Sequence, residues 1–323
     1  MTARNKSDTL FAPIDGSVTP RFGGIPTFMR LPHVTDPALV DIALVGVPWD
    51  GGTTNRAGAR HGPREIRNMS SFMRRINPSS RINPYALCKV ADLGDTGVNP
   101  IDLLQSMDII EDLFRDIHAA GTVPLSAGGD HLMTLPIMRA IARDQPVGMV
   151  HFDAHADTGD SYFGGHKYTH GTPFRRAVEE GLLDPERTVQ IGIRGSMYSE
   201  NDWQFSYDSG MRVITIDEYF DMGADAVIAE ARKVVGDGPT YVSFDVDGLD
   251  PVYAPGTGTP EVGGFSTYDA QKMIRGLRGL HLIGGDVVEV APPYDPSGNT
   301  ALVGATMMFE ILCVLADSIA DRR

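Results

Sequence analysis

Aspartates and histidines recur at short spacing in three strings of the sequence. Two of these strings follow short apolar runs and contain Asp153-Ala-His155-Ala-Asp157 and Asp245-Val-Asp247. Side chains along a strand repeat their direction every two residues, so we expect Asp153 and His155 to share one face, and Asp245 and Asp247 to share another. Each pair would stand at the end of a strand, with Asp157 following as the chain turns.

The third string, Pro124-Leu-Ser-Ala-Gly-Gly-Asp130-His131, brings a histidine after a flexible turn. Carboxylates gathered at strand ends repel one another and raise one another's pKa unless cations neutralise them. A metal cluster is the economical explanation, although an aspartate at a strand end also commonly caps the next turn. The candidate metal ligands are two imidazoles and four carboxylates: His131, Asp153, His155, Asp157, Asp245 and Asp247.

This ligand set contains no thiolate and can hold two ions if one or two carboxylates bridge. Such an oxygen-rich set suits Mn²⁺ better than structural Zn²⁺, and Ni²⁺ and Co²⁺ are alternatives for a site of nitrogen and oxygen ligands. Two ions about 3.5–4 Å apart can share a hydroxide nucleophile. A calcium-binding EF-hand is excluded, because that loop needs Gly and Glu where this chain has Asp250 and Gly256.

Short apolar runs and amphipathic patterns alternate along the chain and predict the elements that must position these residues. Buried strands are expected at 42–47, 147–152, 188–193, 212–216, 241–244 and 282–290. Helices are expected at 103–117 and about 62–76, 134–144, 223–236, 266–278 and 299–319. The alternation predicts an α/β fold with three α-β-α layers and a mostly parallel central sheet, whose ligands bind beyond the carboxyl ends of the strands.

The composition excludes several classes of protein. The 323 residues carry a net charge of −14 and two cysteines, Cys88 and Cys313. The acidic balance disfavours nucleic acid and anionic membranes, and two distant cysteines make no disulfide framework. Without a signal peptide or an 18-residue apolar run, we expect a cytoplasmic protein with an irregular N-terminal arm at 1–35 and a single catalytic domain at 36–323.

The three strings, in their order and contexts, resemble the ureohydrolase family of arginases, agmatinases and guanidino-acid hydrolases. THGTPF (169–174), GTGTPEVGG (256–264) and VVEVAPPYD (287–295) add to a resemblance that runs from about Arg21 to Leu315. The sequence of the segment 46–67, GVPWDGGTTNRAGARHGPREIR, is most similar to the guanidinopropionase and guanidinobutyrase branch. The resemblance implies an arginase-like fold, assembly into homo-trimers or homo-hexamers, and cleavage of a guanidino compound to urea and an amine.

The resemblance also implies which residue binds which ion. One Mn²⁺ would be held by His131, Asp153, Asp157 and Asp245, and the other by Asp153, His155, Asp245 and Asp247, so that Asp153 and Asp245 bridge. A hydroxide between the ions would attack the guanidinium carbon. Asp157 is therefore a candidate catalytic residue as well as a metal ligand.

Two further catalytic residues are implied by the resemblance. His170 would pass a proton to the leaving amine, and Glu289 would pair with the substrate guanidinium. Both roles make physical sense, because a carboxylate can bind the parallel N–H donors of a guanidinium and an imidazole titrates near neutral pH. The plainer alternatives are an ordinary strand-end glutamate and a loop histidine. His151 is expected in the core or beside the ligands, not on a metal.

The loop between Asp157 and His170 is expected to meet the tail of the substrate. A bulky Tyr162 would shorten the pocket and favour a short guanidino acid, 3-guanidinopropionate and then 4-guanidinobutyrate, whereas Asp160 suits the terminal ammonium of agmatine. Arg56 and Arg60 either line the mouth of the site or belong to the loop before the next helix. The alternatives are an agmatinase, a hydrolase of guanidine or alkylated guanidines, a deacetylase-like hydrolase and a catalytically silent assembly subunit.

Overall fold

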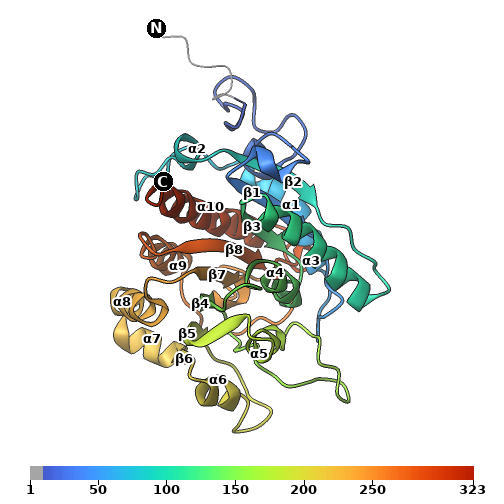
Figure 1. The fold of residues 1–323 in the computed structure, drawn as a ribbon, viewed down its shortest axis with the longest axis vertical. Coiled ribbons are helices and arrows are strands. Elements are labelled where there is room, and N and C mark those ends of the chain that lie inside the picture. Colours follow the sequence, from blue (N-terminus) through green and yellow to red (C-terminus); the bar gives the residue numbers. More distant parts are fainter. Residues whose placement is uncertain (1–9) are drawn as a thin grey trace.

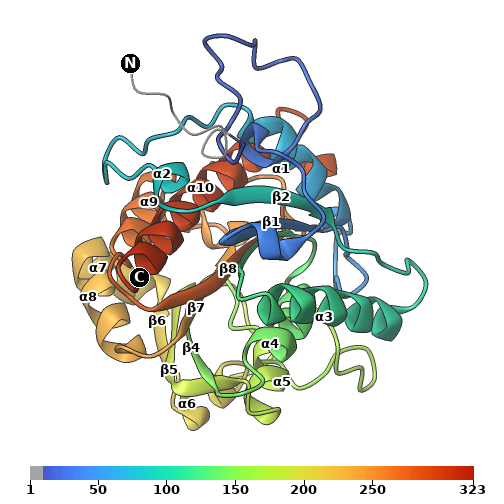
Figure 2. The same ribbon diagram turned by 45° about the horizontal axis from the view of Figure 1, so that its top comes forward.

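A single twisted sheet organises the chain in the computed structural model, which describes residues 10–323. Within those residues the sheet has eight strands in the order β2-β1-β3-β8-β7-β4-β5-β6, and every neighbouring pair is parallel. Figure 2 shows the sheet running from β2 near the top to β5 and β6 at the lower left. The predicted α/β fold with a parallel central sheet is confirmed.

All six predicted strands are present, two with the predicted ends and four with shifted ends, and two more strands complete the sheet. The strands are β1 (Ile42–Val47), β2 (Val90–Asp95), β3 (Val123–Gly128), β4 (Val147–Phe152), β5 (Leu183–Ile193), β6 (Arg212–Thr215), β7 (Thr240–Asp245) and β8 (Leu282–Val288). The additional strands are β2 and β3. Their hydrophobic pattern is weak because Asp92 and Asp95 lie in β2, whereas β3 contains Pro124 and Ser126.

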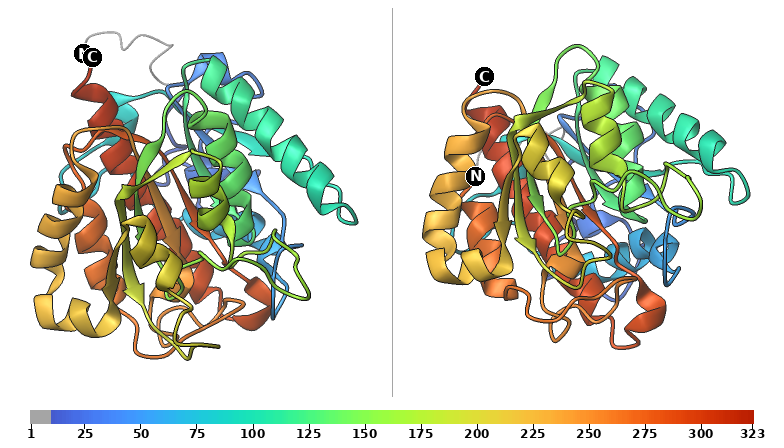
Figure 3. Two further views of the ribbon diagram at one scale, coloured as in Figure 1. Left: turned by 60° about the horizontal axis from the view of Figure 1, so that its bottom comes forward. Right: turned by 90° about the horizontal axis from the view of Figure 1, so that it is seen from below.

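Helices cover both faces of the sheet, as Figures 1 and 3 show. They are α1 (Gly62–Ser70), α2 (Pro84–Leu87), α3 (Leu103–Ala119), α4 (Thr134–Ile141), α5 (Pro173–Glu179), α6 (Gln204–Ser209), α7 (Ile216–Met222), α8 (Ala224–Val235), α9 (Thr267–Arg275) and α10 (Asn299–Ala320). The predicted helix at 62–76 is wrong beyond Ser70. The Ser70 hydroxyl turns into the core, where it accepts the backbone N–H of Met29 at 2.7 Å, and the chain continues in tight turns.

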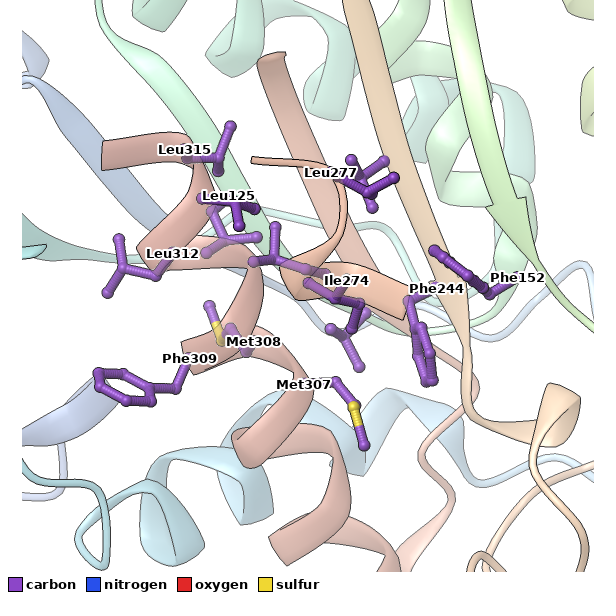
Figure 4. Packing of buried hydrophobic residues seen from close by; sticks show 14 of the residues in the cluster. Leu125, Phe152, Phe244, Ile274, Leu277, Met307, Met308, Phe309, Leu312 and Leu315 are labelled. Carbon is purple, nitrogen blue, oxygen red and sulfur yellow. The ribbon is translucent and has the colours of Figure 1, made fainter. Parts of the chain in front are cut away.

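The helix α10 is the largest contributor to the core on its face of the sheet. Its side chains Met307, Met308 and Leu312 are fully buried, and Figure 4 shows them among residues of the sheet and of α9. By length and composition α10 could cross a membrane, which corrects the expectation that no such apolar run exists. However, 83% of its most apolar window is buried inside the fold, where α10 packs on β8 and α1.

Residues 10–35 belong to the predicted N-terminal arm, and residues 1–9 of that arm lie outside the described residues. The segment is fastened to the body at Phe28, whose backbone N–H donates to Asp92 at 2.9 Å and whose ring lies 4.1 Å from the Arg67 guanidinium. Phe28 is completely buried. The division of the chain at residue 35 stays a prediction.

Candidate metal centre and active site

Four adjacent strands in the middle of the sheet deliver the predicted site residues. The loop after β3 carries His131, the loop after β4 carries Asp153 to Asp157, and the end of β7 carries Asp245 and Asp247, while Glu289 follows β8. All of these strands run in the same direction, so their carboxyl ends meet at one edge of the sheet. The structure therefore brings all six predicted metal ligands and Glu289 to one place.

The expectation that residue pairs share a strand face is wrong in detail. The strand β4 ends at Phe152, so Asp153 and His155 lie in the bend that follows it. Asp245 is the last residue of β7, and Asp247 lies in the 3-10 turn Val246–Gly248. These side chains converge because the chain turns sharply at each strand end, and not because they repeat along a pleat.

Each turn is held by an aspartate that caps it. Asp153 Oδ1 accepts the backbone N–H of His155 at 2.6 Å, and Asp245 Oδ1 accepts that of Asp247 at 2.8 Å. In both residues the other oxygen, Oδ2, points toward His131. The capping explanation is therefore confirmed for these aspartates, and it is compatible with the metal explanation, because one oxygen shapes the turn and the other faces the cluster.

The first group of ligands surrounds one imidazole nitrogen. His131 Nδ1 lies 3.0 Å from Asp157 Oδ2, 3.1 Å from Asp153 Oδ2 and 3.2 Å from Asp245 Oδ2. This nitrogen is buried, yet no hydrogen bond with acceptable direction reaches it. A buried nitrogen that faces three carboxylate oxygens without a hydrogen bond fits a metal ion held by all four groups.

The second group shares Asp153 with the first. His155 Nδ1 lies 3.2 Å from Asp247 Oδ2 and 3.5 Å from Asp153 Oδ1. Asp153 Oδ2 faces the first group, and Oδ1, which also caps the turn, lies beside His155 of the second group, so the bridging role of Asp153 is compatible with this geometry and stays a prediction. The oxygen Asp245 Oδ1 accepts a backbone N–H, so the bridging role of Asp245 stays a prediction.

A chain of buried hydrogen bonds orients His131. Its Nε2–H donates to Ser243 Oγ at 2.8 Å, and the Ser243 hydroxyl donates to Asp286 Oδ1 at 2.8 Å. Asp286 also accepts hydrogen bonds from the Thr134 and Tyr241 hydroxyls. With the proton on Nε2, the lone pair of Nδ1 is directed at the carboxylates. This is the tautomer in which Nδ1 can bind a metal ion.

The sequence analysis did not identify Ser243 and Asp286 as contributors to the site. A signal existed for Ser243, which precedes Asp245 by two residues on β7 and so shares its face. His151, which was expected in the core or beside the ligands, donates from Nε2 to Asp153 Oδ2 at 2.8 Å. Its Nδ1 faces the Gln190 amide nitrogen at 3.2 Å, so both ring nitrogens of His151 are engaged within the protein.

The electrostatics of the cluster favour bound cations. Burial and the neighbouring carboxylates of Asp247 and Asp153 raise the pKa of Asp245 well above its usual range. Burial lowers the pKa of His131, but the three carboxylates of Asp153, Asp157 and Asp245 close to Nδ1 outweigh burial and raise that pKa well above its usual value. Protons on these groups relieve the repulsion in the metal-free protein, and metal ions would replace them.

Glu289 and His170 form an ion pair beside the cluster. Glu289 follows β8 with a left-handed φ of 64°, which turns its buried side chain toward the site. Its Oε1 accepts the His131 backbone N–H at 2.9 Å and lies 2.8 Å from His170 Nδ1, whereas its Oε2 has no hydrogen-bond partner among the described residues. His170 Nε2 lies 2.7 Å from Thr54 Oγ1 and accepts the Thr54 backbone N–H at 3.1 Å.

The cluster opens into a cleft of 1210 Å³ that the loop 158–170 borders. Tyr162 lines this cleft with its ring packed on Gly171, where an added Cβ would lie 2.8 Å from the Tyr162 hydroxyl. Asp160 also lines the cleft, but its Oδ1 lies 3.2 Å from Arg176 and 3.4 Å from Arg175. The charge of Asp160 is therefore already paired with two arginines.

The structure separates the two arginines whose roles the sequence left open. Arg60 forms an ion pair with the buried Asp50 and lies at the start of α1, so it holds the loop. Arg56 lines the cleft, where its guanidinium lies over the ring of Tyr294. Both interpretations of this segment are therefore correct, each for one residue.

Removing the hydroxyl of Ser243 tests whether the hydrogen-bond chain orients His131 for a metal. Ser243→Ala should weaken Mn²⁺ binding about 10- to 100-fold, because the His131 ring loses the acceptor that fixes its tautomer. Competition with a fluorescent chelator measures this affinity. Ser126→Ala, which removes a buried hydroxyl without a hydrogen-bond partner, is the matched control and should bind Mn²⁺ like the wild type. Equal affinity in Ser243→Ala and the wild type would contradict the role of Ser243.

The ion pair of His170 with Glu289 predicts a pH-dependent stability in the metal-free protein. Burial opposes protonation of His170, but the Glu289 carboxylate outweighs burial and raises the pKa of His170 to about 9. The stabilisation is therefore complete below the unfolded pKa of 6.5 and is lost as the pH rises through 9. Relative to His170→Gln, the wild type should lose about 3 kcal/mol of unfolding free energy between about pH 6 and pH 10. Urea unfolding measures it, and a difference independent of pH would contradict the ion pair.

Comparison with known proteins shows the family to which this chain belongs. The arginase family matches residues 40–314. A protein named guanidinopropionase from Pseudomonas aeruginosa is 67% identical over 95% of this chain and 97% of its own length. A guanidinobutyrase from the same organism is 51% identical over 95% of this chain and 97% of its own length.

Two solved structures match the fold. The proclavaminate amidino hydrolase from Streptomyces clavuligerus has a TM-score of 0.89 and 38% identity, covering 93% of this chain and all of that one. A formiminoglutamase from Trypanosoma cruzi, solved with Mn²⁺, has a TM-score of 0.80 and 26% identity, covering 91% of this chain and 99% of that one. The fold is therefore arginase-like, as the motifs predicted. The chain belongs to the arginase family and is a ureohydrolase.

Proposed function

We propose that this protein hydrolyses 3-guanidinopropionate to urea and 3-aminopropanoate. The observation that carries this proposal is the 67% identity, over almost the whole of both chains, to a protein named guanidinopropionase. The neutralised Asp160 supports a guanidino acid over agmatine, because an acidic group that is already paired with two arginines attracts a substrate ammonium weakly.

We propose further that the two ligand groups hold two Mn²⁺ ions. Three observations support this assignment. Nδ1 of His131 has no hydrogen-bond partner among the described residues, Asp153 lies beside both ligand groups, and Mn²⁺ is named for the formiminoglutamase structure. Ions bound there would supply Lewis-acid activation of water at neutral pH. Asp157 remains among the ligands and needs no separate catalytic role.

Glu289 is the residue that we propose binds and orients the substrate guanidinium. Its carboxylate is buried, and Oε2 has no partner among residues 10–323, so a ligand N–H is the missing donor. Oε1 is fixed by His131 and His170, which holds the plane of the carboxylate. A guanidinium bound by Glu289 would present its central carbon beside the ligand cluster.

His170 is the residue that we propose protonates the leaving amine. The Glu289 carboxylate raises the pKa of His170 to about 9 against the effect of burial, so the imidazole carries a proton at neutral pH. Its Nδ1–H is committed to Glu289, and Nε2 lies beside Thr54, a residue that lines the cleft. The proton that reaches the substrate nitrogen would therefore leave from Nε2 of the imidazolium, in which the Thr54 hydroxyl oxygen accepts from Nε2 and the Thr54 backbone N–H no longer donates to it.

The proposed assembly is a homo-trimer or a homo-hexamer. Three apolar side chains of the N-terminal segment, Val18, Phe22 and Ile25, are at least 80% exposed in the single chain. Apolar side chains that gather on one short segment favour burial against another subunit. Sedimentation analysis of the purified protein tests this, and a monomer would contradict the assembly.

Urea release by the Mn²⁺-loaded protein tests the proposed substrate. We expect 3-guanidinopropionate to have the highest kcat/KM in a panel with 4-guanidinobutyrate, agmatine, arginine and methylguanidine. A preference for 4-guanidinobutyrate would instead assign this protein the activity for which the guanidinobutyrase relative is named. A preference for agmatine would contradict the argument from Asp160. If no substrate yields urea, the remaining alternative is that the protein is a catalytically silent assembly subunit.

Replacing the Glu289 carboxylate by an amide tests its role in binding the guanidinium. Glu289→Gln keeps the size of the side chain and should retain the bound Mn²⁺, because Glu289 is not among the ligand groups. The value of kcat/KM should fall about 100- to 1000-fold, since a buried charge-assisted hydrogen bond to the substrate is lost. Steady-state urea release and metal analysis measure both quantities, with the exposed Glu180→Gln as control. Unaltered turnover in Glu289→Gln would refute this role.

The hydroxyl of Tyr162 is expected to influence which tail length is preferred. Tyr162→Phe should change the ratio of kcat/KM for 3-guanidinopropionate over 4-guanidinobutyrate at least about threefold while leaving the metal content unchanged. Tyr198→Phe is a suitable control, because Tyr198 lines the same cleft but is 93% exposed. If Tyr162→Phe keeps the wild-type ratio, Tyr162 does not set the preference for the tail.

A further inference from the structure

Three arginines line the cleft, and they differ in what already occupies their guanidinium groups. Arg175 contacts the carboxylates of Asp160 and Glu179. Arg194 directs its donors at backbone carbonyls, including those of Asp247 and Gly248, and so fastens the metal-binding turn. Arg56 and Arg194 both make no ion pair within residues 10–323, but all three guanidinium nitrogens of Arg194 donate to backbone carbonyls, whereas only two of those of Arg56 do.

The side chain of Arg56 is held in place without being neutralised. Its Nε donates to the Gly258 carbonyl at 3.2 Å and one terminal nitrogen donates to the Thr257 carbonyl at 2.6 Å. The guanidinium carbon lies 4.4 Å from the centre of the Tyr294 ring, and the Tyr294 hydroxyl is fixed on the Ala57 carbonyl. The second terminal nitrogen makes no hydrogen bond with any residue that the structure describes. A cation ordered in this way loses little entropy when it binds an anion.

Arg56 also lies on the side of the cleft where the substrate tail must be. Two residues before it, Thr54 contacts His170 Nε2, the atom from which the leaving amine would take its proton. The tail of a guanidino acid departs with that amine. The loop that carries Arg56 is therefore next to the nitrogen that bears the tail.

The distance between Arg56 and Glu289 suits a short guanidino acid. A Cβ on Gly258 would lie 3.7 Å from Glu289 Oε2, and the carbonyl of Gly258 accepts the Arg56 Nε–H at 3.2 Å. With covalent lengths added, the guanidinium carbon of Arg56 lies no more than about 12 Å from Oε2. An extended 3-guanidinopropionate is about 7 Å long, and a charge-assisted hydrogen bond of about 2.8 Å at each end lets it reach both groups.

We propose that Arg56 is the residue that binds the substrate carboxylate and so determines the preference for guanidino acids over uncharged or cationic guanidines. This inference rests on the proposed function. It gives the cleft two charged ends, with Glu289 holding the guanidinium and Arg56 holding the carboxylate. A guanidine without a carboxylate would leave Arg56 unpaired, which reduces the affinity of the cleft for it.

The test compares 3-guanidinopropionate with propylguanidine, which has the same length and a methyl group in place of the carboxylate. In Arg56→Gln, kcat/KM for 3-guanidinopropionate should fall about 10- to 100-fold, whereas kcat/KM for propylguanidine should stay within about twofold of the wild type. If propylguanidine turns over too slowly, its inhibition constant provides the same comparison. Metal analysis confirms that each variant is loaded.

Two further variants keep the test decisive. Arg115→Gln removes an exposed arginine that does not line the cleft and should leave the ratio between the two substrates unchanged. Arg56→Lys keeps the positive charge but lacks the planar guanidinium, so it should lose part of the activity on 3-guanidinopropionate and none on propylguanidine. This variant provides the test if Arg56→Gln does not fold. An equal loss on both substrates, or no loss on the acid, would overturn the role of Arg56. A wild type that hydrolyses no guanidino acid would instead overturn the proposed function.

Discussion

The repulsion among buried carboxylates is the constraint on which the rest of this structure depends. Asp153, Asp245 and Asp247 are almost completely buried, and Asp157 is nearly so. Gathering such charges away from water is costly unless cations compensate them. The two imidazoles among the ligands do so in part when they are protonated, and metal ions would do so more completely. The fold therefore carries a built-in affinity for divalent cations at this edge of the sheet.

The parallel sheet makes this arrangement possible. Strands β3, β8, β7 and β4 are neighbours, so residues from four distant parts of the chain arrive together at their carboxyl ends. The core of the sheet also fixes the ligands from behind, since Ser243 and Asp286 lie on β7 and β8 and hold His131. Of the residues that would bind substrate, Glu289 directly follows β8 at this edge, and Arg56 donates a hydrogen bond to Gly258, whose backbone lies close to Glu289.

Much of the site was predictable from the sequence because its chemistry is concentrated in short strings. The six ligands, Glu289 and His170 were identified from motifs, and the structure brings them together. The strand β3 was missed because proline and serine interrupt its apolar pattern, although it delivers His131. The turns after β4 and β7 could not be predicted by a strand period, because capping hydrogen bonds form them.

The contributions that sequence alone could not assign depend on contacts between distant residues. Nothing in the local sequence distinguishes Arg56 from Arg60. In the structure, the Arg56 guanidinium lies over the Tyr294 ring in the cleft, whereas Arg60 forms an ion pair with Asp50. In the same way, Asp160 looks like an available acidic group until Arg175 and Arg176 are seen beside it. Such differences arise from the packing of loops that are far apart in the chain.

The number of Mn²⁺ ions bound per chain tests the central claim most directly. Calorimetric titration of the metal-free protein gives this number without any assumption about the substrate. If the buried carboxylates form two ligand groups that share Asp153, the titration should saturate at two ions per chain. Saturation at one ion, or no binding at all, would contradict this account of the cluster.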